Sequence, residues 1–333
     1  MRPLRTEARF PSIPAEAGHY ESFYLKATAP EGGRSVWIRH TVHKRPGEPL
    51  TGAVWMTYFD AGKERPLAAK RQVDASHVSI PRDAYIRVGD SEIAPGRMQG
   101  VVGSDDLEAS WNLRFRDHSP VLRHFPSMWM YERQLPRTKL LSPHPNVTFD
   151  GILQVGEERI SIEEWPGMVG HNWGAEHAEN WVWIHTSTRE EDGSRGYVDL
   201  AAGRVRIGPV VTPWVINGQI LHNGEEFRVG GFRKAPRTKL DAKPTSCSFT
   251  APGSGFTVRG NVSAPIETFA GWLYADPKGP DHHALHSSIA DIELQIDRPR
   301  GIPVKIRVER AATYELGTRR RDHGIAILPF PDG

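Results

Sequence analysis

The residues most able to do chemistry lie in the middle of the chain, where residues 167–174 read Gly-Met-Val-Gly-His-Asn-Trp-Gly. This stretch sets the imidazole of His171, the amide of Asn172 and the indole of Trp173 among glycines. Because glycine lets other groups approach the backbone closely, the setting suits a binding or catalytic site better than a plain core. An imidazole held there can take up or deliver a proton, and the adjacent amide can fix its orientation by hydrogen bonding.

Two later runs add aromatic and acidic side chains. Residues two apart in a β-strand share a face, so Tyr197 and Asp199 point the same way. Trp181, Trp183 and His185 share a face for the same reason. If these faces point into a barrel, its cavity contains aromatic rings, an imidazole and one carboxyl group. The alternative is a tryptophan-rich β core with a buried His–Asp pair.

The elements that must position these residues are predicted to be short strands. The chain of 333 residues contains 32 glycines, 27 prolines and 10 tryptophans. Runs such as 35–43 and 52–59 are rich in β-branched and aromatic residues and are bounded by Gly, Pro or Asp. Their spacing fits the antiparallel hairpins of a sandwich or barrel.

The sequence also resembles itself. Residues 36–41 resemble 182–186, and residues 87–95 resemble 228–236, in the same order along the chain. These matches predict two β modules of ordinary domain size. The proline-rich stretch 136–151 reads as the linker between them. We therefore expect an N-terminal barrel over 1–140 and a C-terminal barrel over 141–333 that carries the site.

The sequence contains three motifs of note: Gly-x-x-Gly-His171-Asn172-Trp173-Gly174, Trp181-x-Trp183 and Tyr197-x-Asp199. Together they resemble the motifs of the lipocalin-like family of bacterial carotenoid 1,2-hydratases, also called hydroxyneurosporene synthases. Plant tocopherol cyclases and some natural-product Diels–Alderases are more distant members of the same grouping. The resemblance implies an all-β fold of two tandem lipocalin-like antiparallel β-barrels. It also implies that His171, Trp173, Tyr197 and Asp199 are site residues. The hydratases usually have an acidic residue immediately before the histidine, where this chain has Gly170.

Chemistry of this kind begins with protonation of a carbon–carbon double bond. A carboxyl group in an apolar barrel has a raised pKa, so Asp199 is the expected proton donor. His171 would orient this acid or activate water, and aromatic faces would stabilise the carbocation. The sequence thus predicts two sets of site residues: catalytic Asp199, His171 and Tyr197, and substrate-binding Trp173, Asn172, Trp181 and Trp183.

Composition and missing motifs exclude several other functions. The 42 Lys and Arg against 40 Asp and Glu leave a net charge of +2, so nothing indicates a nucleic-acid or anionic membrane partner. The single cysteine, Cys247, excludes an intrachain disulfide and a cysteine-rich metal site. Dinucleotide, P-loop, HExxH and GxSxG motifs are absent from the sequence. We expect no cofactor.

A histidine-rich stretch, Asp-His-His-Ala-Leu-His over 281–286, has the short spacing of metal ligands. It offers no clear third ligand, so a solvated turn is the favoured reading and no metal is expected. The N-terminal residues lack the apolar run of a signal peptide, and no stretch approaches the ~18 apolar residues of a membrane span. We expect a cytoplasmic protein.

The leading hypothesis from the sequence is an enzyme. It would be a cofactor-independent hydratase, cyclase or isomerase that acts by acid catalysis on a hydrophobic terpenoid- or polyketide-like substrate. The alternative is a non-catalytic carrier of a lipid or isoprenoid ligand, since lipocalin-like barrels often only bind. A third possibility is an interaction protein whose barrels are filled by side chains.

Overall fold

The computed structural model describes residues 4–133, 136–190 and 192–332. Their regular structure is almost entirely antiparallel β, and the α-helix among them, α1 (Trp129–Glu132), has four residues. Four short 3₁₀ turns also occur: η1 (Phe10–Ser12), η2 (Ala75–His77), η3 (Phe232–Arg237) and η4 (Ile266–Thr268). Within the described residues, no helix is long and apolar enough to cross a bilayer. The all-β prediction is confirmed.

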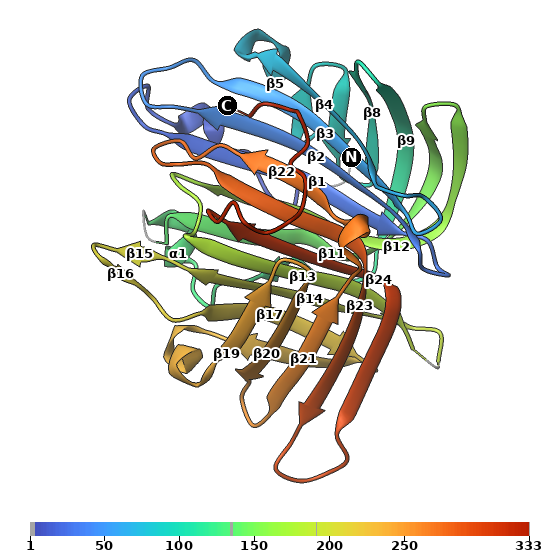
Figure 1. The fold of residues 1–333 in the computed structure, drawn as a ribbon, viewed down its shortest axis with the longest axis vertical. Coiled ribbons are helices and arrows are strands. Elements are labelled where there is room, and N and C mark those ends of the chain that lie inside the picture. The colour runs from blue at the N-terminus through green and yellow to red at the C-terminus, as the bar shows by residue number, and fades with distance from the viewer. Residues whose placement is uncertain (1–3, 134–135, 191, 333) are drawn as a thin grey trace.

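The first sheet has twelve strands in the order β4-β3-β2-β1-β12-β11-β9-β8-β7-β6-β5, with β10 paired to β11. The edge strand β4 packs against β8 and β9, so the sheet curls into a nearly closed barrel (Figure 1). Its strands are β1 (His19–Thr28), β2 (Arg34–Lys44), β3 (Thr51–Asp60), β4 (Leu67–Asp74), β5 (Val78–Ser79), β6 (Ile86–Val88), β7 (Ser91–Ala94), β8 (Arg97–Ser104), β9 (Leu107–Asp117), β10 (Leu122–Arg123), β11 (Thr138–Val155) and β12 (Glu158–Gly174).

The second sheet has ten strands in the order β18-β17-β14-β13-β24-β23-β21-β20-β19, with β22 paired to β23. It curls into a half-barrel below the first sheet in Figure 1. Its strands are β13 (Asn180–Arg189), β14 (Arg195–Arg204), β17 (Val215–His222), β18 (Glu225–Gly230), β19 (Lys239–Lys243), β20 (Ser246–Pro252), β21 (Thr257–Ser263), β22 (Ala270–Tyr274), β23 (His282–Asp297) and β24 (Val304–Thr318). The strands β15 (Arg206–Ile207) and β16 (Val210–Val211) pair with each other in a separate two-stranded antiparallel sheet.

The chain passes from the first sheet to the second between β12 and β13, so the boundary expected at residue 140 lies inside β11. The linker expected over 136–151 is wrong, because residues from Thr138 onward form β11. Proline removes a ladder hydrogen bond and is tolerated in strands at bulges. The β11–β12 pairing has irregularities from Leu141 to His144 and on to Val147, where Pro143 and Pro145 lie.

The buried apolar side chains form three clusters. One fills the first barrel, one fills the half-barrel, and the third lies between the sheets. We call this third cluster the aromatic layer. It consists mainly of Tyr24, Trp37, Trp55, Phe59, Met168, Trp183, Trp272 and Tyr274. Four of the ten tryptophans of the sequence therefore lie in the layer that joins the two sheets.

The aromatic layer generates a stability prediction. Trp272 is 0% exposed and packs against both Trp37 and Trp55 of the first sheet. Trp272→Ala should lower the free energy of unfolding by about 3–5 kcal/mol, because a large cavity would separate the sheets. Urea denaturation followed by circular dichroism measures the free energy of unfolding of each variant. The exposed Trp129 is the matched control, and Trp129→Ala should stay within about 0.5 kcal/mol. Equal effects of the two substitutions would contradict the role of the layer.

Candidate functional site at the contact between the sheets

The structure separates the predicted site residues into two places. His171 and Trp173 alternate with Asn172 along β12 and face the first barrel, where the His171 ring stacks on Phe23 at a centroid distance of 4.0 Å. Asp199 lies on the opposite side of β14 from Val198 and Leu200, which fill the half-barrel, and therefore faces the first sheet. No interaction joins Asp199 to His171 within the described part of the chain.

His171 is enclosed by hydrogen bonds inside the first barrel. Its Nε2 lies 2.8 Å from Glu21 Oε1, and its Nδ1 lies 2.7 Å from Thr6 Oγ1. Burial alone would raise the pKa of Glu21, but hydrogen bonds from His171 and His19 outweigh it and lower this pKa to about 2. The backbone N–H groups of Arg9 and Phe10 also donate to the same carboxylate. His171 thus holds the N-terminal segment against the barrel directly through Thr6, and Glu21 holds it through the backbone of Arg9.

Asp199 is fully buried and makes three polar contacts. Its Oδ2 accepts a hydrogen bond from Ser142 Oγ at 2.5 Å and lies 3.5 Å from His124 Nε2. Its Oδ1 accepts one from Trp183 Nε1 at 3.2 Å. Burial would raise the pKa of Asp199, but the charge and hydrogen bond of His124 lower it to about 2. The expectation of a protonated Asp199 is wrong, because burial here comes with donors that favour the carboxylate.

His124, which follows β10, is the important residue that sequence reasoning missed. Its side chain is buried, with Nε2 3.2 Å from Ser142 Oγ. Since the Ser142 hydroxyl gives its hydrogen to Asp199, its oxygen accepts from His124 Nε2–H, so that in the neutral form of the ring the lone pair is on Nδ1. That Nδ1 is buried and makes no hydrogen bond to the described residues. No spacing motif links His124 to Asp199, so the sequence carried no signal for it.

Tyr24 occupies the space that Gly170 leaves open. The two residues are opposite each other in the β1–β12 pairing, and a Cβ at position 170 would lie 2.2 Å from Tyr24 Cζ. The Tyr24 ring meets Trp183 edge-on at a centroid distance of 5.3 Å. Burial raises the pKa of Tyr24, and the nearby Asp199 carboxylate raises it further, so the phenol stays neutral. The end of the Tyr24 ring and its hydroxyl therefore fill the place that a side chain at position 170 would take.

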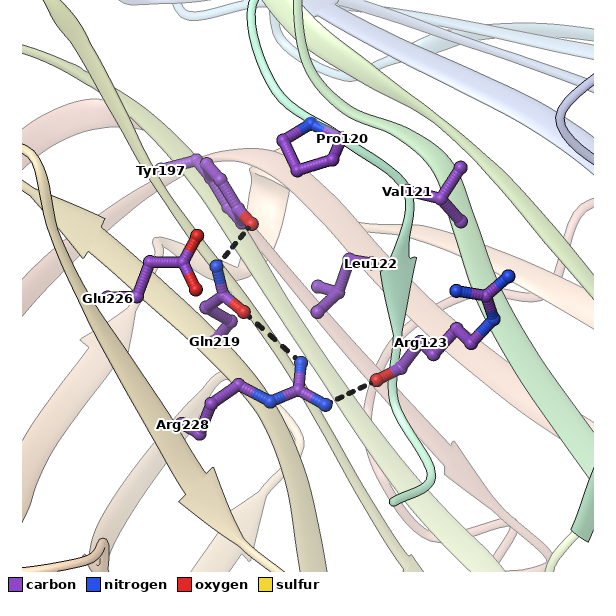
Figure 2. A pocket seen from close by; sticks show the side chains of 8 residues that line it. All are labelled: Pro120, Val121, Leu122, Arg123, Tyr197, Gln219, Glu226 and Arg228. Atoms are coloured by element: carbon purple, nitrogen blue, oxygen red, sulfur yellow. Dashed lines mark hydrogen bonds between the residues drawn. The ribbon is translucent and has the colours of Figure 1, made fainter. Parts of the chain in front are cut away.

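Tyr197 lines a pocket of about 310 Å³ at the edge of the contact between the sheets (Figure 2). Its hydroxyl accepts a hydrogen bond from Gln219 Nε2 at 3.0 Å, and Gln219 Oε1 accepts one from Arg228 Nη1 at 3.2 Å. The remaining lining residues are Pro120, Val121, Leu122, Arg123 and Glu226. His124 follows Arg123 directly, and Asp199 is two residues from Tyr197 on the same strand face. Neither His124 nor Asp199 lines the pocket itself, which has apolar side chains on one side and polar groups on the other.

The other predicted binding residues lie away from Asp199. The Trp173 ring stacks on His171 at 4.5 Å and carries the Arg9 guanidinium 5.2 Å from its centre. Trp181 Nε1 donates to Glu315 Oε1 at 2.7 Å. Asn172 is half-buried on the face of β12 opposite His171, and its Oδ1 has no hydrogen-bond partner among the described residues. Of the predicted set, the structure brings only Trp183 into direct contact with Asp199.

Comparisons with known proteins relate this chain to others mainly through its fold. No protein-family model matches it. Two uncharacterized proteins from strains of Mycobacterium tuberculosis, MT0513 and Rv0493c, are each 26% identical over 303 residues, which is 87% of this chain and 84% of theirs.

Solved structures similar to this one include two named proteins and one putative assignment. A putative AttH from Nitrosomonas europaea has a TM-score of 0.54 at 11% identity, covering 94% of this chain and 97% of its own. Kievitone hydratase from Nectria haematococca has a TM-score of 0.51 at 10% identity, covering 91% and 90%. CghA, solved with Sch210972, has a TM-score of 0.51 at 9% identity, covering 90% and 88%. These likenesses show a shared fold of one nearly closed barrel and one half-barrel.

The lowered pKa of Asp199 predicts a specific pH dependence. A carboxyl whose folded-state pKa is about 2 stabilises the fold above its ordinary pKa of 3.8 and loses that contribution as the pH falls through 2. The stability difference between wild type and Asp199→Asn should therefore shrink by about 2 kcal/mol between pH 6 and pH 2. Urea denaturation of both proteins at several pH values from 6 to 2 measures this difference in the free energy of unfolding.

The exposed Asp105 provides the control for this measurement. Asp105→Asn should change the free energy of unfolding by less than about 0.5 kcal/mol at each pH. A difference between wild type and Asp199→Asn that stays constant from pH 6 to pH 2 would contradict the lowered pKa, because it would mean that folding leaves the pKa of Asp199 unchanged. A difference that changes in the opposite direction would mean that Asp199 is protonated in the folded protein.

Proposed function

We propose that this protein is a hydratase- or cyclase-type enzyme acting on a hydrophobic small molecule, with proton transfer through the His124–Asp199 pair. The observation that carries the proposal is this buried pair, whose His124 Nδ1 is left without a partner among the described residues. The fold shared with a named hydratase supports the reaction class. The binding of Sch210972 by CghA supports a small-molecule ligand.

The arrangement of the His124–Asp199 pair suits a general base that accepts a proton and later returns it to the substrate. The Asp199 carboxylate orients the imidazole and stabilises the imidazolium formed when Nδ1 takes a proton. Ser142 fixes the carboxylate through its hydrogen bond. The role proposed for Asp199 is therefore to position and stabilise His124, in place of the direct proton donation expected from the sequence.

A hydration by this pair balances without any other reactant. Water gives a proton to His124 Nδ1 as its oxygen forms a bond to one carbon of a conjugated double bond. The electron pair of that double bond moves to the second carbon, which then takes the proton back from His124. In a cyclisation, the same nitrogen would accept a proton from a substrate hydroxyl and return it to carbon. Imidazole suits both steps because it exchanges protons near neutral pH.

The surroundings favour a substrate with an apolar skeleton and a polar end. The aromatic side chains of Tyr24 and Trp183 lie beside Asp199 and offer apolar surface to a substrate skeleton. The pocket at Tyr197 adds the amide of Gln219 and the guanidinium of Arg228. Terpenoid and polyketide-like molecules combine both features. Gly170 stands where the carotenoid hydratases usually have an acidic residue, which argues against carotenoid hydration itself.

The proposal predicts separate effects on turnover and on binding. His124→Gln should lower kcat by roughly 10²–10⁴-fold, as expected for loss of a general base, while substrate affinity is retained. Purified protein would be incubated with a panel of terpenoid and polyketide-like compounds in water labelled with heavy oxygen. Mass spectrometry then detects hydration as one labelled water added, and cyclisation as a new isomer of unchanged mass.

Asp117→Asn provides a control of matched chemistry. Asp117 is also a carboxylate paired with a histidine, but its partner His144 lies inside the first barrel. This variant should keep wild-type turnover. Full turnover in His124→Gln would refute the proposed base. Tight binding of panel compounds without conversion by the wild type would instead favour the non-catalytic carrier.

A further inference from the structure

A second polar cluster lies away from Asp199, where three segments meet. His177 belongs to the turn between β12 and β13, Asp276 follows β22, and His282 begins β23. Their side chains are 9%, 1% and 0% exposed. One possible ligand atom from each residue lies within 4.8 Å of the others. The fold thus gathers two imidazoles and a carboxylate that are distant in sequence.

The polar atoms of this cluster are poorly satisfied. Both ring nitrogens of His177 and of His282 make no hydrogen bond within the part of the chain that the structure describes, nor does Asp276 Oδ2. A buried donor or acceptor left without a partner destabilises the fold. Several such atoms facing one another indicate a ligand that binds to imidazole and carboxylate together.

A metal ion fits both the residue types and the distances. His282 Nδ1 lies 3.6 Å from Asp276 Oδ2, and His177 Nδ1 lies 3.7 Å from Asp276 Oδ1. Zinc bonds to nitrogen and oxygen are about 2.0–2.2 Å long, so two ligands of a tetrahedral ion are roughly 3.3–3.5 Å apart. We propose that His177, Asp276 and His282 bind one divalent metal ion of the zinc type. Three protein ligands would leave a fourth position for water.

Neighbouring side chains fix the orientation of these ligands. The Trp181 ring packs against both imidazoles, with centroid distances of 5.4 Å to His177 and 5.2 Å to His282. Tyr20 of the first sheet stacks on His177 at 3.8 Å. Arg319 places Nη2 3.6 Å from Asp276 Oδ2, and its charge is offset by Glu179, which accepts from Arg319 Nη1 at 2.6 Å.

The sequence expectation of no metal rested on the missing third ligand near residues 281–286. The fold supplies that ligand as His177, which is 99 residues before Asp276. The adjacent histidines of the motif have other partners: His283 contacts His323 at 2.7 Å, and His286 contacts Glu315 at 2.9 Å. An ion at this cluster would fasten the turn that joins the two sheets to the β22–β23 hairpin.

The test uses the full chain without an affinity tag, after treatment with a chelator. Titration with Co²⁺ should give d–d absorption that saturates at one equivalent per chain, and Zn²⁺ should abolish it by competition. Zn²⁺ should also raise the Tm of the wild type, because a ligand that binds only the folded state stabilises it. None of these readouts depends on the enzymatic proposal.

Asp276→Asn and His282→Gln should each weaken Co²⁺ binding by at least about tenfold, whereas the matched variant His283→Gln should bind as the wild type does. Circular dichroism checks that each variant is folded. Failure of the chelator-treated, folded wild type to bind either metal stoichiometrically would overturn the proposal, without requiring any variant to fold. Unchanged binding in both ligand variants would overturn it as well.

Discussion

The alternation of side chains along β1 connects the two halves of the molecule. Phe23 and Leu25 point into the first barrel, while Tyr24 and Lys26 point toward the second sheet, where Lys26 Nζ donates to the carbonyl of Ala311. A shift of one residue in the pairing of β1 would exchange these two sets. The same register places Tyr24 over Gly170 and brings Glu21 to His171, so the aromatic layer and the hydrogen bonds of His171 depend on it.

Buried carboxylates in this fold are repeatedly paired with histidine. Glu21 pairs with His171 inside the first barrel, and Asp199 pairs with His124 at the contact between the sheets. Glu315 forms a third such pair with His286 beneath the aromatic layer. A carboxylate removed from water stays ionised only where donors replace the lost hydration. The surrounding donors therefore decide the protonation state of each group, and burial alone is a poor guide to it.

Alternating sequence patterns were sufficient to predict the strands and the faces that Asp199 and Trp183 share with their neighbours. They did not show which core each face meets, because strands such as β1 are buried on both sides and have no contrast between apolar and polar faces. The prolines of β11 suggested a linker because proline usually interrupts strands, whereas here they lie at bulges. His124 and His177 could not be assigned, because sheet pairing brings together residues that no short motif connects.

The pairing of β1 with β12 has a consequence for how the chain folds during synthesis. Glu21 and His171 are 150 residues apart, so β1 leaves the ribosome long before its partner strand exists. At a translation rate of about 5–20 residues per second, the wait is roughly 8–30 s. During that time one edge of β1, with its apolar side chains and unpaired backbone groups, is exposed to other nascent chains. In the finished barrel this edge of β1 is covered by β12, but that pairing is long-range and therefore slow to form. The partly synthesised chain is thus the species most prone to aggregation.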